Sequence, residues 1–443
     1  MRYAETGFNL EIDLSRGNIE RVASDPMETE LYLGGLGTNA KIMWDRVPPE
    51  VEAFSPDNLL IFAAGLLCGT PAPGCNRTIV TTISPQTKLL AFSMMGGFWA
   101  PELKYAGYDK IILSGKSPDL VYLWINNDTV ELRDASHLQG KGAIETEKLI
   151  QQELNEPKAQ VLSIGLAGEN KVYFASIEQG RSSASRGGIG AVMGDKGVKA
   201  IAVRGTGDIN IAQAEEFLGM CNEVLEYIKV RDAKPIPGVM PILAGLGSPQ
   251  EMKTHDEKWH TESFMWGNSR HRRKGFWTEE VEKEWTETLE NARKRLISCY
   301  NCPMKCGATI SIEGLPTYMM KCFSKLTYTM AAMSNLDFGL KIAQRATEYG
   351  VDAFSTPQVM AFALELYEND ILSDEDMKGM PESNDEKFFW LLDRIVRREG
   401  IGDALANGTY WAAKEIGKGA EDYAHNNIKK HEQMPLKLSM LNP

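Results

Sequence analysis

Three cysteines lie close together in the second half of the chain: Cys299, Cys302 and Cys306, with the spacing C-x2-C-x3-C. Thiolates at this spacing can hold three corners of one iron–sulfur cube, because a short loop wraps around it while a fourth ligand comes from a distant part of the chain. Radical-SAM enzymes carry a similar loop with the reverse spacing, C-x3-C-x2-C, so a radical-SAM enzyme is disfavoured. A structural zinc site prefers a second cysteine pair or nearby histidines. The array predicts a [4Fe–4S] cluster ahead of zinc, with free buried cysteines third.

Two glycine-rich stretches form a second group of candidates. Residues 186–194 read RGGIGAVMG, and residues 65–77 read GLLCGTPAPGCNR. Glycines at this density let the backbone approach a ligand and present amide donors to phosphate oxygens. In the second stretch Arg77 could hold a phosphate by two parallel hydrogen bonds, and Asn76 could bond a heterocycle. Neither stretch is a Walker or dinucleotide motif, so tight structural turns are the alternative for both.

The elements that must position these residues change along the chain. Up to about residue 205 the pattern predicts strands, with hairpins at residues 10–19 and 121–132. After about residue 212 it predicts helices. One covers residues 340–349 and ends at Gly350, and another begins with Thr356 as N-cap. The sequence predicts an α+β fold in which a sheet-rich domain precedes largely helical domains.

Length and composition bound the class of protein. The chain has 443 residues, of which 43% are hydrophobic, enough for two or three domains with buried cores. We place these at 1–208 (sheet-rich and cofactor-binding), 209–405 (helical, with the cysteine loop) and 406–443 (the start of a further helical domain). The last residues follow an amphipathic stretch with no closing polar tail, so we expect a chain truncated at its C-terminus.

Net charge, targeting signals and cysteine number limit the possible partners and the cellular location of the protein. The net charge of −12 disfavours a nucleic-acid partner. A signal peptide and an uninterrupted 18-residue apolar segment are both lacking, so the sequence predicts a cytoplasmic protein with no transmembrane segment. Seven cysteines, an odd number with three clustered, favour metal ligation over a disulfide framework.

Five ordered motifs and the cysteine array together resemble the aldehyde ferredoxin oxidoreductase family. The resemblance covers essentially the whole chain. The motifs lie at residues 32–37, 69–74, 101–109, 134–138 and 188–194.

The resemblance implies a cofactor and the residues that bind it. It implies tungsten, or molybdenum, held by two pyranopterins, with Mg²⁺ bridging the pterin phosphates and the [4Fe–4S] cluster near one pterin. The fourth cluster ligand is then expected outside this chain. This chain departs from the family pattern at Thr347, Ser182 and Ser185. The implied cofactor-binding residues are Asn76, Arg77, Gly96, Gly97, Gly187, Gly188 and Asp352.

Two departures from aldehyde-oxidising members bear on the reaction. Where those members carry a Gly-Pro-Glu segment near the metal, this chain has Cys322 in the stretch MKCFSK, so a thiolate could ligate tungsten directly. A small buried hydrophobe is the alternative for that cysteine. Residues 247–266 resemble the class II benzoyl-CoA reductases within the family, and that likeness implies Glu251 and His260 as the pair that delivers protons.

The expected activity follows from this likeness. The chain is expected to reduce the aromatic ring of benzoyl-CoA, or a related aromatic thioester, to a cyclic diene with two low-potential electrons and two protons. Those electrons imply an iron–sulfur electron-transfer subunit and, beyond it, a larger electron-donating complex. One alternative is oxidation of aldehydes to carboxylates with ferredoxin. An alternative of another class is a non-catalytic fragment that serves as a binding or assembly subunit.

Overall fold

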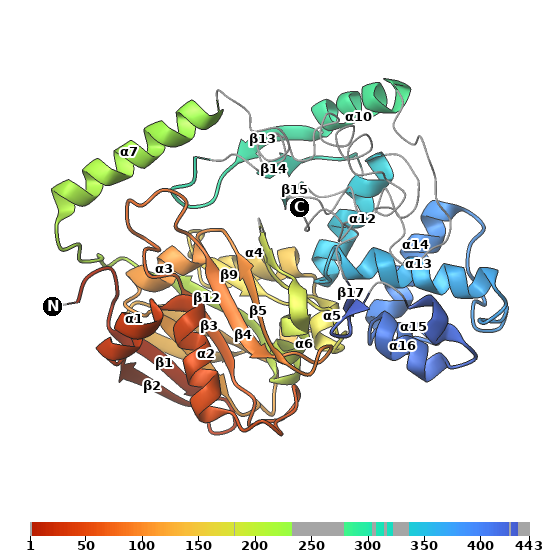
Figure 1. Cartoon of the computed structure of the whole chain (residues 1–443), viewed down its shortest axis with the longest axis horizontal. Coiled ribbons are helices and arrows are strands. Elements are labelled where there is room, and N and C mark those ends of the chain that lie inside the picture. Colours follow the sequence, from red (N-terminus) through yellow and green to blue (C-terminus); the bar gives the residue numbers. More distant parts are fainter. Residues whose placement is uncertain are drawn as a thin grey trace, which may run out of the picture.

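The computed structural model describes residues 2–180, 182–232, 279–303, 307–313, 317–321, 336–424 and 427–432. Within these residues two six-stranded sheets come first, and a mainly helical part follows (Figure 1). The predicted α+β class is therefore confirmed. The domain boundaries at residues 208 and 405 stay predictions.

The first sheet starts with the predicted N-terminal hairpin. β1 (Phe8–Asp13) and β2 (Asn18–Ala23) pair antiparallel. β1 also pairs in parallel with β6, and the sheet has the order β2-β1-β6-β3-β4-β5. The added strands are β3 (Leu60–Ala64), β4 (Thr78–Ile83), β5 (Leu90–Met95) and β6 (Lys110–Ser114).

The second sheet contains the other predicted hairpin and has the order β11-β10-β9-β12-β7-β8. β12 pairs in parallel with β7, whereas the other pairs are antiparallel. The strands are β7 (Val121–Asn126), β8 (Thr129–Asp134), β9 (Gln160–Ser163), β10 (Ile177–Gln179), β11 (Ser182–Ala184) and β12 (Val198–Arg204).

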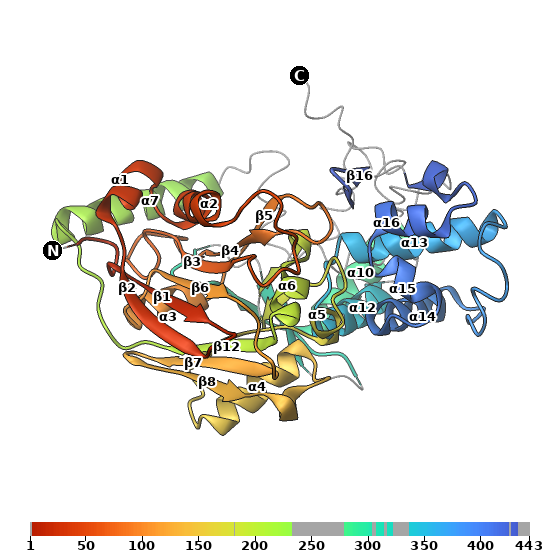
Figure 2. The same cartoon turned by 90° about the horizontal axis from the view of Figure 1, so that it is seen from below.

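The two sheets stack as layers, with α2 (Gly35–Arg46) outside the first and α4 (Ala143–Glu153) outside the second (Figure 2). Alternating residues such as Phe62 and Leu123 form one apolar core between them. Trp99 opens α3 (Trp99–Tyr105), is fully buried in this core and donates from its indole nitrogen to the carbonyl of Ile201 at 3.1 Å. This contact fixes α3, and the turn before it, against the second sheet.

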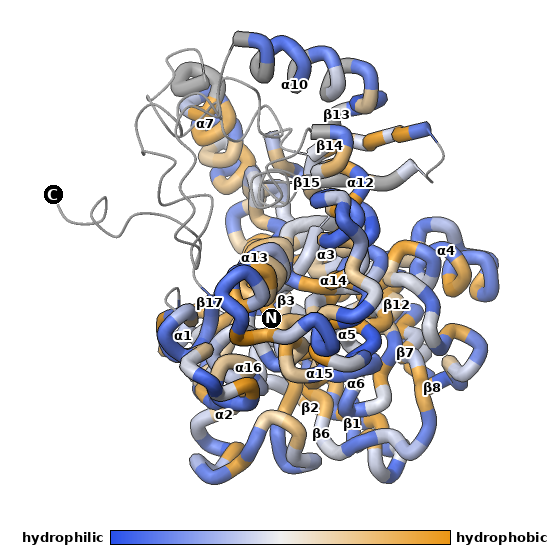
Figure 3. Tube along the Cα trace, turned by 90° about the vertical axis from the view of Figure 1, so that its right-hand side faces the viewer, coloured by the Kyte–Doolittle hydropathy of each residue, from blue (hydrophilic) through white to orange (hydrophobic). Residues whose placement is uncertain are grey.

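The helical part has several amphipathic helices around a second core. In Figure 3, α13 is largely hydrophobic and α10 largely hydrophilic. Among the described residues, no helix combines the length and apolar character needed to cross a membrane. The main helices are α7 (Ala214–Asp232), α10 (Glu279–Ala292), α12 (Leu336–Tyr349), α13 (Ser355–Glu368), α14 (Asn384–Arg397), α15 (Ile401–Leu405) and α16 (Thr409–Ile416).

The beginning of α13 differs from the prediction. α12 ends before Gly350, as expected, and Gly350 takes a positive φ of 70°. α13 begins at Ser355, however, so Thr356 lies inside the first turn and does not cap it. The Asp352 carboxylate accepts hydrogen bonds from the amides of Phe354 and Ser355 at 3.1 and 3.2 Å, which satisfies donors that the helix leaves unpaired.

A three-stranded antiparallel sheet interrupts the part predicted to be helical. It consists of β13 (Arg293–Ile297), β14 (Gly307–Ile310) and β15 (Tyr318–Lys321). These strands are only four or five residues long, and β13 opens with three basic residues, so no alternation of apolar residues marks them. The connection between β13 and β14 carries the cysteine array.

The core of the helical part extends into the sheet-rich part. Phe174 and Ala175, which follow α5 (Leu166–Glu169), belong to the same buried cluster as Leu391 of α14. Ala175 forms an isolated antiparallel bridge with Val351. This junction carries the N-terminal end of α13 directly to the second sheet.

A buried ion pair ties the start of the chain to the glycine-rich stretch at residues 65–77. Lys104 of α3 is 1% exposed, and its ammonium donates to Asp109 Oδ1 at 2.9 Å and to the carbonyls of Ala4 and Leu66. Burial works against the charge of Asp109, but the Lys104 ammonium and the backbone amides of the N-terminal segment outweigh it, so the pKa of Asp109 is lowered. The Asp109 carboxyl is therefore charged in the folded protein.

Removing the Lys104 ammonium is expected to destabilise the folded protein. We expect Lys104→Met to lower the free energy of unfolding by about 3–5 kcal/mol, because the Asp109 carboxylate stays buried without its partner. The control is Lys141→Met, which removes a solvent-exposed i,i+4 pair with Glu145 and should cost about 0.5 kcal/mol or less. Urea unfolding followed by circular dichroism measures both. Equal losses in the two variants would contradict this account.

Candidate cofactor and cluster site

The cysteine array begins on the β13–β14 connection. Cys299 is buried, Cys302 is half-buried, and the amide of Cys302 donates to the carbonyl of Cys299 at 3.2 Å in a tight turn. Cys306 lies outside the described residues. The described residues contain no group of three histidine, cysteine or acidic side chains placed to hold a metal ion.

The turn of the array is held by two of the segments predicted to bind a cofactor. The side-chain amide of Asn76 donates to the carbonyl of Tyr300 at 2.9 Å. The amide of Tyr300 donates in turn to the carbonyl of Gly97 at 3.0 Å, and the amide of Gly74 donates to the carbonyl of Asn301 at 2.8 Å. Residues 65–77, the Gly96–Gly97 turn and the cysteine loop therefore meet in one place, although more than 200 residues separate them in sequence.

The ring of Tyr300 adds a second attachment. The Tyr105 hydroxyl donates to the carbonyl of Gly69 at 2.6 Å. The Tyr300 hydroxyl lies 2.7 Å from the Tyr105 hydroxyl and 3.2 Å from the same carbonyl, and its single hydrogen is shared between these two acceptors. The ring meets Phe98 edge to face, with centroids 6.2 Å apart. Sequence analysis did not single out Tyr300 or Tyr105, although the place of Tyr300 between two cysteines was a signal.

The glycine-rich stretch at residues 186–194 requires its glycines for backbone reasons. Gly187 and Gly188 take φ values of 83° and 65° just before α6 (Ile189–Asp195), in the left-handed region that favours glycine. A Cβ atom at Gly188 would lie 2.1 Å from the carbonyl oxygen of Tyr173. These glycines therefore form a tight turn. Their binding of a cofactor remains a prediction.

Arg186, next to that turn, connects it to Asp352. The Arg186 guanidinium donates to Asp352 Oδ2 at 3.0 Å, contacts His431 Nδ1 at 3.1 Å and donates to the carbonyl of Glu432. Burial and the neighbouring guanidinium lower the pKa of His431. Asp352 is thus next to the glycine turn, as its predicted role requires, and sequence analysis missed Arg186 as its partner.

A second carboxyl, Glu178 of β10, lies near Asp352 and was not predicted. The hydroxyls of Ser176 and Ser183 donate to its Oε1 at 2.5 and 2.7 Å. Burial raises the pKa of Glu178 to about 7, and the charges of Asp352 and Glu348 act in the same direction. A substantial fraction of Glu178 is therefore uncharged near neutral pH.

This raised pKa predicts a pH dependence of stability. When the pKa of a carboxyl rises from 4.5 to about 7 on folding, the unfolded chain loses its proton first as pH rises, so stability falls between about pH 4.5 and 7. Above that window the loss is about 3 kcal/mol. We expect Glu178→Gln to remove this part of the pH dependence. Urea unfolding at pH 5 and pH 8 checks it, and parallel pH profiles for the variant and the wild type would rule it out.

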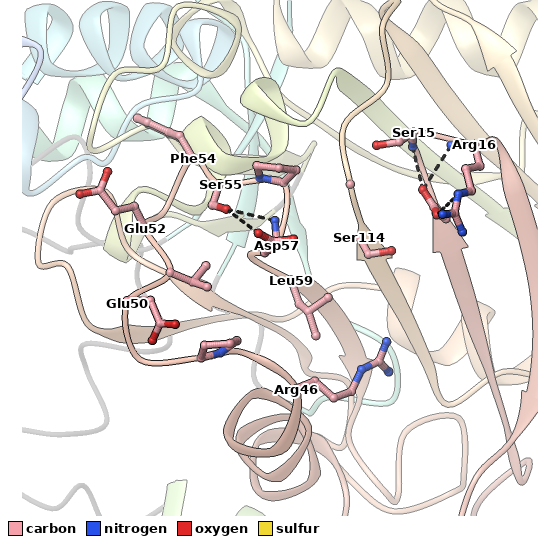
Figure 4. A pocket seen from close by; sticks show the side chains of 15 residues that line it. Ser15, Arg16, Arg46, Glu50, Glu52, Phe54, Ser55, Asp57, Leu59 and Ser114 are labelled. Atoms are coloured by element: carbon pink, nitrogen blue, oxygen red, sulfur yellow. Dashed lines mark hydrogen bonds and ion pairs between the residues drawn. The ribbon is translucent and has the colours of Figure 1, made fainter.

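A large cavity among the described residues lies elsewhere. It has a volume of about 970 Å³ and lies between the β1–β2 turn, the end of β6 and the loop that follows α2. Figure 4 shows that charged side chains, including Arg46, Glu50, Glu52 and Asp57, surround it. None of the residues predicted to bind cofactor or metal lines this cavity.

Four predicted site residues cannot be placed. Glu251, His260, Cys306 and Cys322 lie outside the described residues, so their roles stay predictions. Asn76, Gly97 and the first two cysteines of the array are brought together, and Gly187, Gly188 and Asp352 form a second group. Arg77 is exposed, and among the described residues its guanidinium has no hydrogen-bond or ion-pair partner.

Two models of one protein family match most of the chain. The N-terminal domain of aldehyde ferredoxin oxidoreductase matches residues 9–205, and domains 2 and 3 of the same family match residues 223–442. The chain therefore belongs to the aldehyde ferredoxin oxidoreductase family.

Individual relatives refine the comparison. The tungsten-containing aldehyde ferredoxin oxidoreductase of Pyrococcus abyssi is 35% identical over 440 residues, which cover 96% of this chain and 69% of that protein. The WOR-like subunit of an aliphatic sulfonate oxidoreductase of Pyrococcus furiosus is 31% identical and covers 94% and 68%. A chain of the active-site complex BamBC of benzoyl coenzyme A reductase, solved with 1,5-dienoyl-CoA, is 78% identical with a TM-score of 0.94. That match covers 99% of this chain and 67% of the solved chain.

The residues present fit a tungsten pterin such as these relatives imply. At Gly97 a Cβ atom would lie 2.1 Å from the Oε1 of Gln179, so only glycine lets this side chain pack against the backbone there. Gln179 Oε1 is itself a buried acceptor with no hydrogen bond from any described residue. With the exposed Arg77, this gives a surface that offers a cation for phosphate and a free acceptor for a heterocycle.

Proposed function

We propose that this chain is the catalytic subunit of an enzyme that reduces the aromatic ring of benzoyl-CoA to a cyclic dienoyl-CoA. The balanced reaction adds two electrons and two protons to the ring and breaks no bond to coenzyme A. The observation that carries the proposal is the 78% identity, over 99% of this chain, to a chain solved with the dienoyl product. The family's tungsten-containing aldehyde oxidoreductases are only 32–35% identical, which makes aldehyde oxidation the second candidate.

The protein's part in this chemistry is to hold the redox groups. Cys299, Cys302 and Cys306 supply three ligands of a [4Fe–4S] cluster, and Cys322 supplies a thiolate to the metal. Asn76 and Gly97 hold the cysteine loop against the cofactor surface. When bound, a tungsten or molybdenum bis-pyranopterin supplies electron transfer at low potential.

The remaining predicted cofactor contacts are a cationic side chain and two glycine turns. Arg77, exposed and without a described partner, would bind pterin phosphates, and bound Mg²⁺ would supply further positive charge. The turn at Gly187 and Gly188 lets the backbone approach the cofactor closely, and Arg186 holds that turn to Asp352. Gly96, next to Gly97, has no side chain either, so it too lets the cofactor approach the backbone closely.

Two side chains deliver the protons. His260 carries an imidazole, which titrates nearest to neutral pH and suits general acid catalysis. Glu251 relays protons to it, provided that burial keeps its carboxyl protonated. Neither side chain is proposed to bind a metal or transfer electrons. Replacing either one should therefore lower the rate of ring reduction and leave the metal content unchanged.

The electrons come from outside this chain, so the proposal includes partners. The similar solved structure is a two-component complex, which supports an iron–sulfur electron-transfer subunit bound to this chain. A larger electron-donating complex must supply that subunit. A coenzyme A thioester is made and used inside the cell, so the location that fits the substrate is the cytoplasm.

Product analysis tests the proposal. Anaerobically purified protein, with its electron-transfer subunit and a low-potential chemical reductant, is incubated with benzoyl-CoA, and the thioesters are separated by chromatography with mass detection. The proposal predicts a product two hydrogens heavier than benzoyl-CoA. Unchanged benzoyl-CoA, together with oxidation of an added aromatic aldehyde to its acid, would establish the second candidate instead. No turnover of either substrate would favour a non-catalytic subunit.

A further inference from the structure

One buried side chain beside the cofactor surface has an unused hydrogen-bonding atom. Gln179, the last residue of β10, is only 3% exposed. Its amide nitrogen donates to the Oε1 of Gln160 on β9 at 3.0 Å. That bond fixes the orientation of the amide group and turns the Gln179 Oε1 away from Gln160.

This oxygen receives no hydrogen bond from any residue that the structure describes. An amide oxygen can only accept, so a donor must come to it. Leaving such an atom buried and unpaired costs free energy, which is why most buried polar atoms in proteins have partners. An unpaired acceptor in a well-packed region therefore points to a ligand or an ordered water.

The surroundings of the oxygen favour a ligand. It lies against Gly97, where a Cβ atom would be 2.1 Å from it. Gly97 has a φ of 141°, and its carbonyl accepts the amide of Tyr300 from the cysteine loop. The free acceptor is thus next to the turn that joins the first sheet, the second sheet and the cluster loop.

We propose that Gln179 is a cofactor-positioning residue whose Oε1 accepts a hydrogen bond from an N–H group of the pterin ring system. This inference rests on the proposed function. Phosphate and dithiolene groups of such a cofactor are acceptors and cannot satisfy the oxygen, whereas the pterin edge carries amino and ring N–H donors. Gln179 orients the ring system, as Arg77 binds the phosphate end.

Substitution by methionine separates a ligand role from a structural one. Gln179→Met keeps nearly the same volume and removes both the acceptor and the donor to Gln160, whereas Gln179→Glu removes the same donor but keeps an acceptor. The difference between these two variants therefore isolates the acceptor. Gln86→Met is the matched control. Gln86 is also buried, its amide nitrogen bonds Glu432 at 2.6 Å, and its Oε1 is likewise unpaired among the described residues.

Two quantities are measured on the whole protein. One is the loss of pterin over time, followed as the fluorescent oxidation product per polypeptide with tungsten by mass spectrometry. The other is the melting temperature of the cofactor-free protein made without tungstate. We expect Gln179→Met to lose pterin about three- to tenfold faster than wild type. Its cofactor-free form should melt no lower than that of Gln179→Glu, which lacks the same bond to Gln160, and Gln179→Glu and Gln86→Met should retain pterin like the wild type.

Other outcomes overturn the inference. Pterin retention equal to wild type in Gln179→Met means that only water uses the oxygen. A cofactor-free Gln179→Met that melts well below wild type, with pterin loss matched by Gln86→Met, means a structural role. Wild-type protein that contains no pterin at all overturns the proposed function itself, which distinguishes that failure from failure at Gln179.

Discussion

Replacing Cys302 by alanine is expected to remove nearly all iron from the chain, from about four atoms per polypeptide to less than one. Ring reduction should be lost with it. The two remaining thiolates of the array cannot hold three corners of a cube. The fold should survive, because the loop is attached by the backbone of Tyr300 and Asn301 to Asn76, Gly97 and Gly74.

The control is a buried cysteine elsewhere in the same chain. Cys221 lies on α7, outside the array, and is 5% exposed. Cys221→Ala should keep its iron and its turnover. Iron content by colorimetric assay and circular dichroism measure both variants. A Cys302→Ala protein with full iron, or equal iron loss in Cys221→Ala, would show that the array does not hold the cluster.

Replacing His260 by alanine should lower the rate of ring reduction by about 10²–10⁴-fold, the usual loss when a positioned general acid is removed. Tungsten and iron should be unchanged, because the imidazole serves as a proton donor and is no ligand. Glu251→Gln, which keeps the size of the side chain and removes its titratable proton, should lower the rate in the same direction.

An exposed histidine controls for histidine loss in general. His137 pairs with Glu153 at 3.1 Å on the outer surface of the second sheet layer, and His137→Ala should leave the rate unchanged. Rates are measured as dienoyl-CoA formed per tungsten atom. Metal loss in His260→Ala would make that residue a ligand or a structural residue, and a rate like that of the wild type would exclude it from proton delivery.

Local features of this protein could be predicted from sequence. The two hairpins, the end of α12 at Gly350 and the glycine turn at 187–188 each depend on neighbouring residues and on backbone preferences. The cysteine array was recognisable because a cluster-binding loop needs its thiolates within a few residues of one another. The α+β class followed from the change from strand-like to helix-like patterns.

Contacts between distant segments could not be predicted in this way. The hydrogen bond from Asn76 to Tyr300 spans 224 residues, and the ion pair of Arg186 and Asp352 spans 166. Both depend on how two sheets stack, and no local pattern encodes that arrangement. Gln179 gave no signal because an unpaired oxygen becomes visible only when its surroundings are known. The start of α13 was missed because its capping carboxylate, Asp352, stands three residues before the helix.

Metal analysis of anaerobically purified protein, combined with EPR of the reduced sample, tests the central claim most directly. The account predicts close to one tungsten and about four irons per polypeptide, with the signal of a reduced [4Fe–4S] cluster. Zinc in place of iron, with no tungsten and no cluster signal, would contradict it and leave a family member that has kept the fold without the redox chemistry.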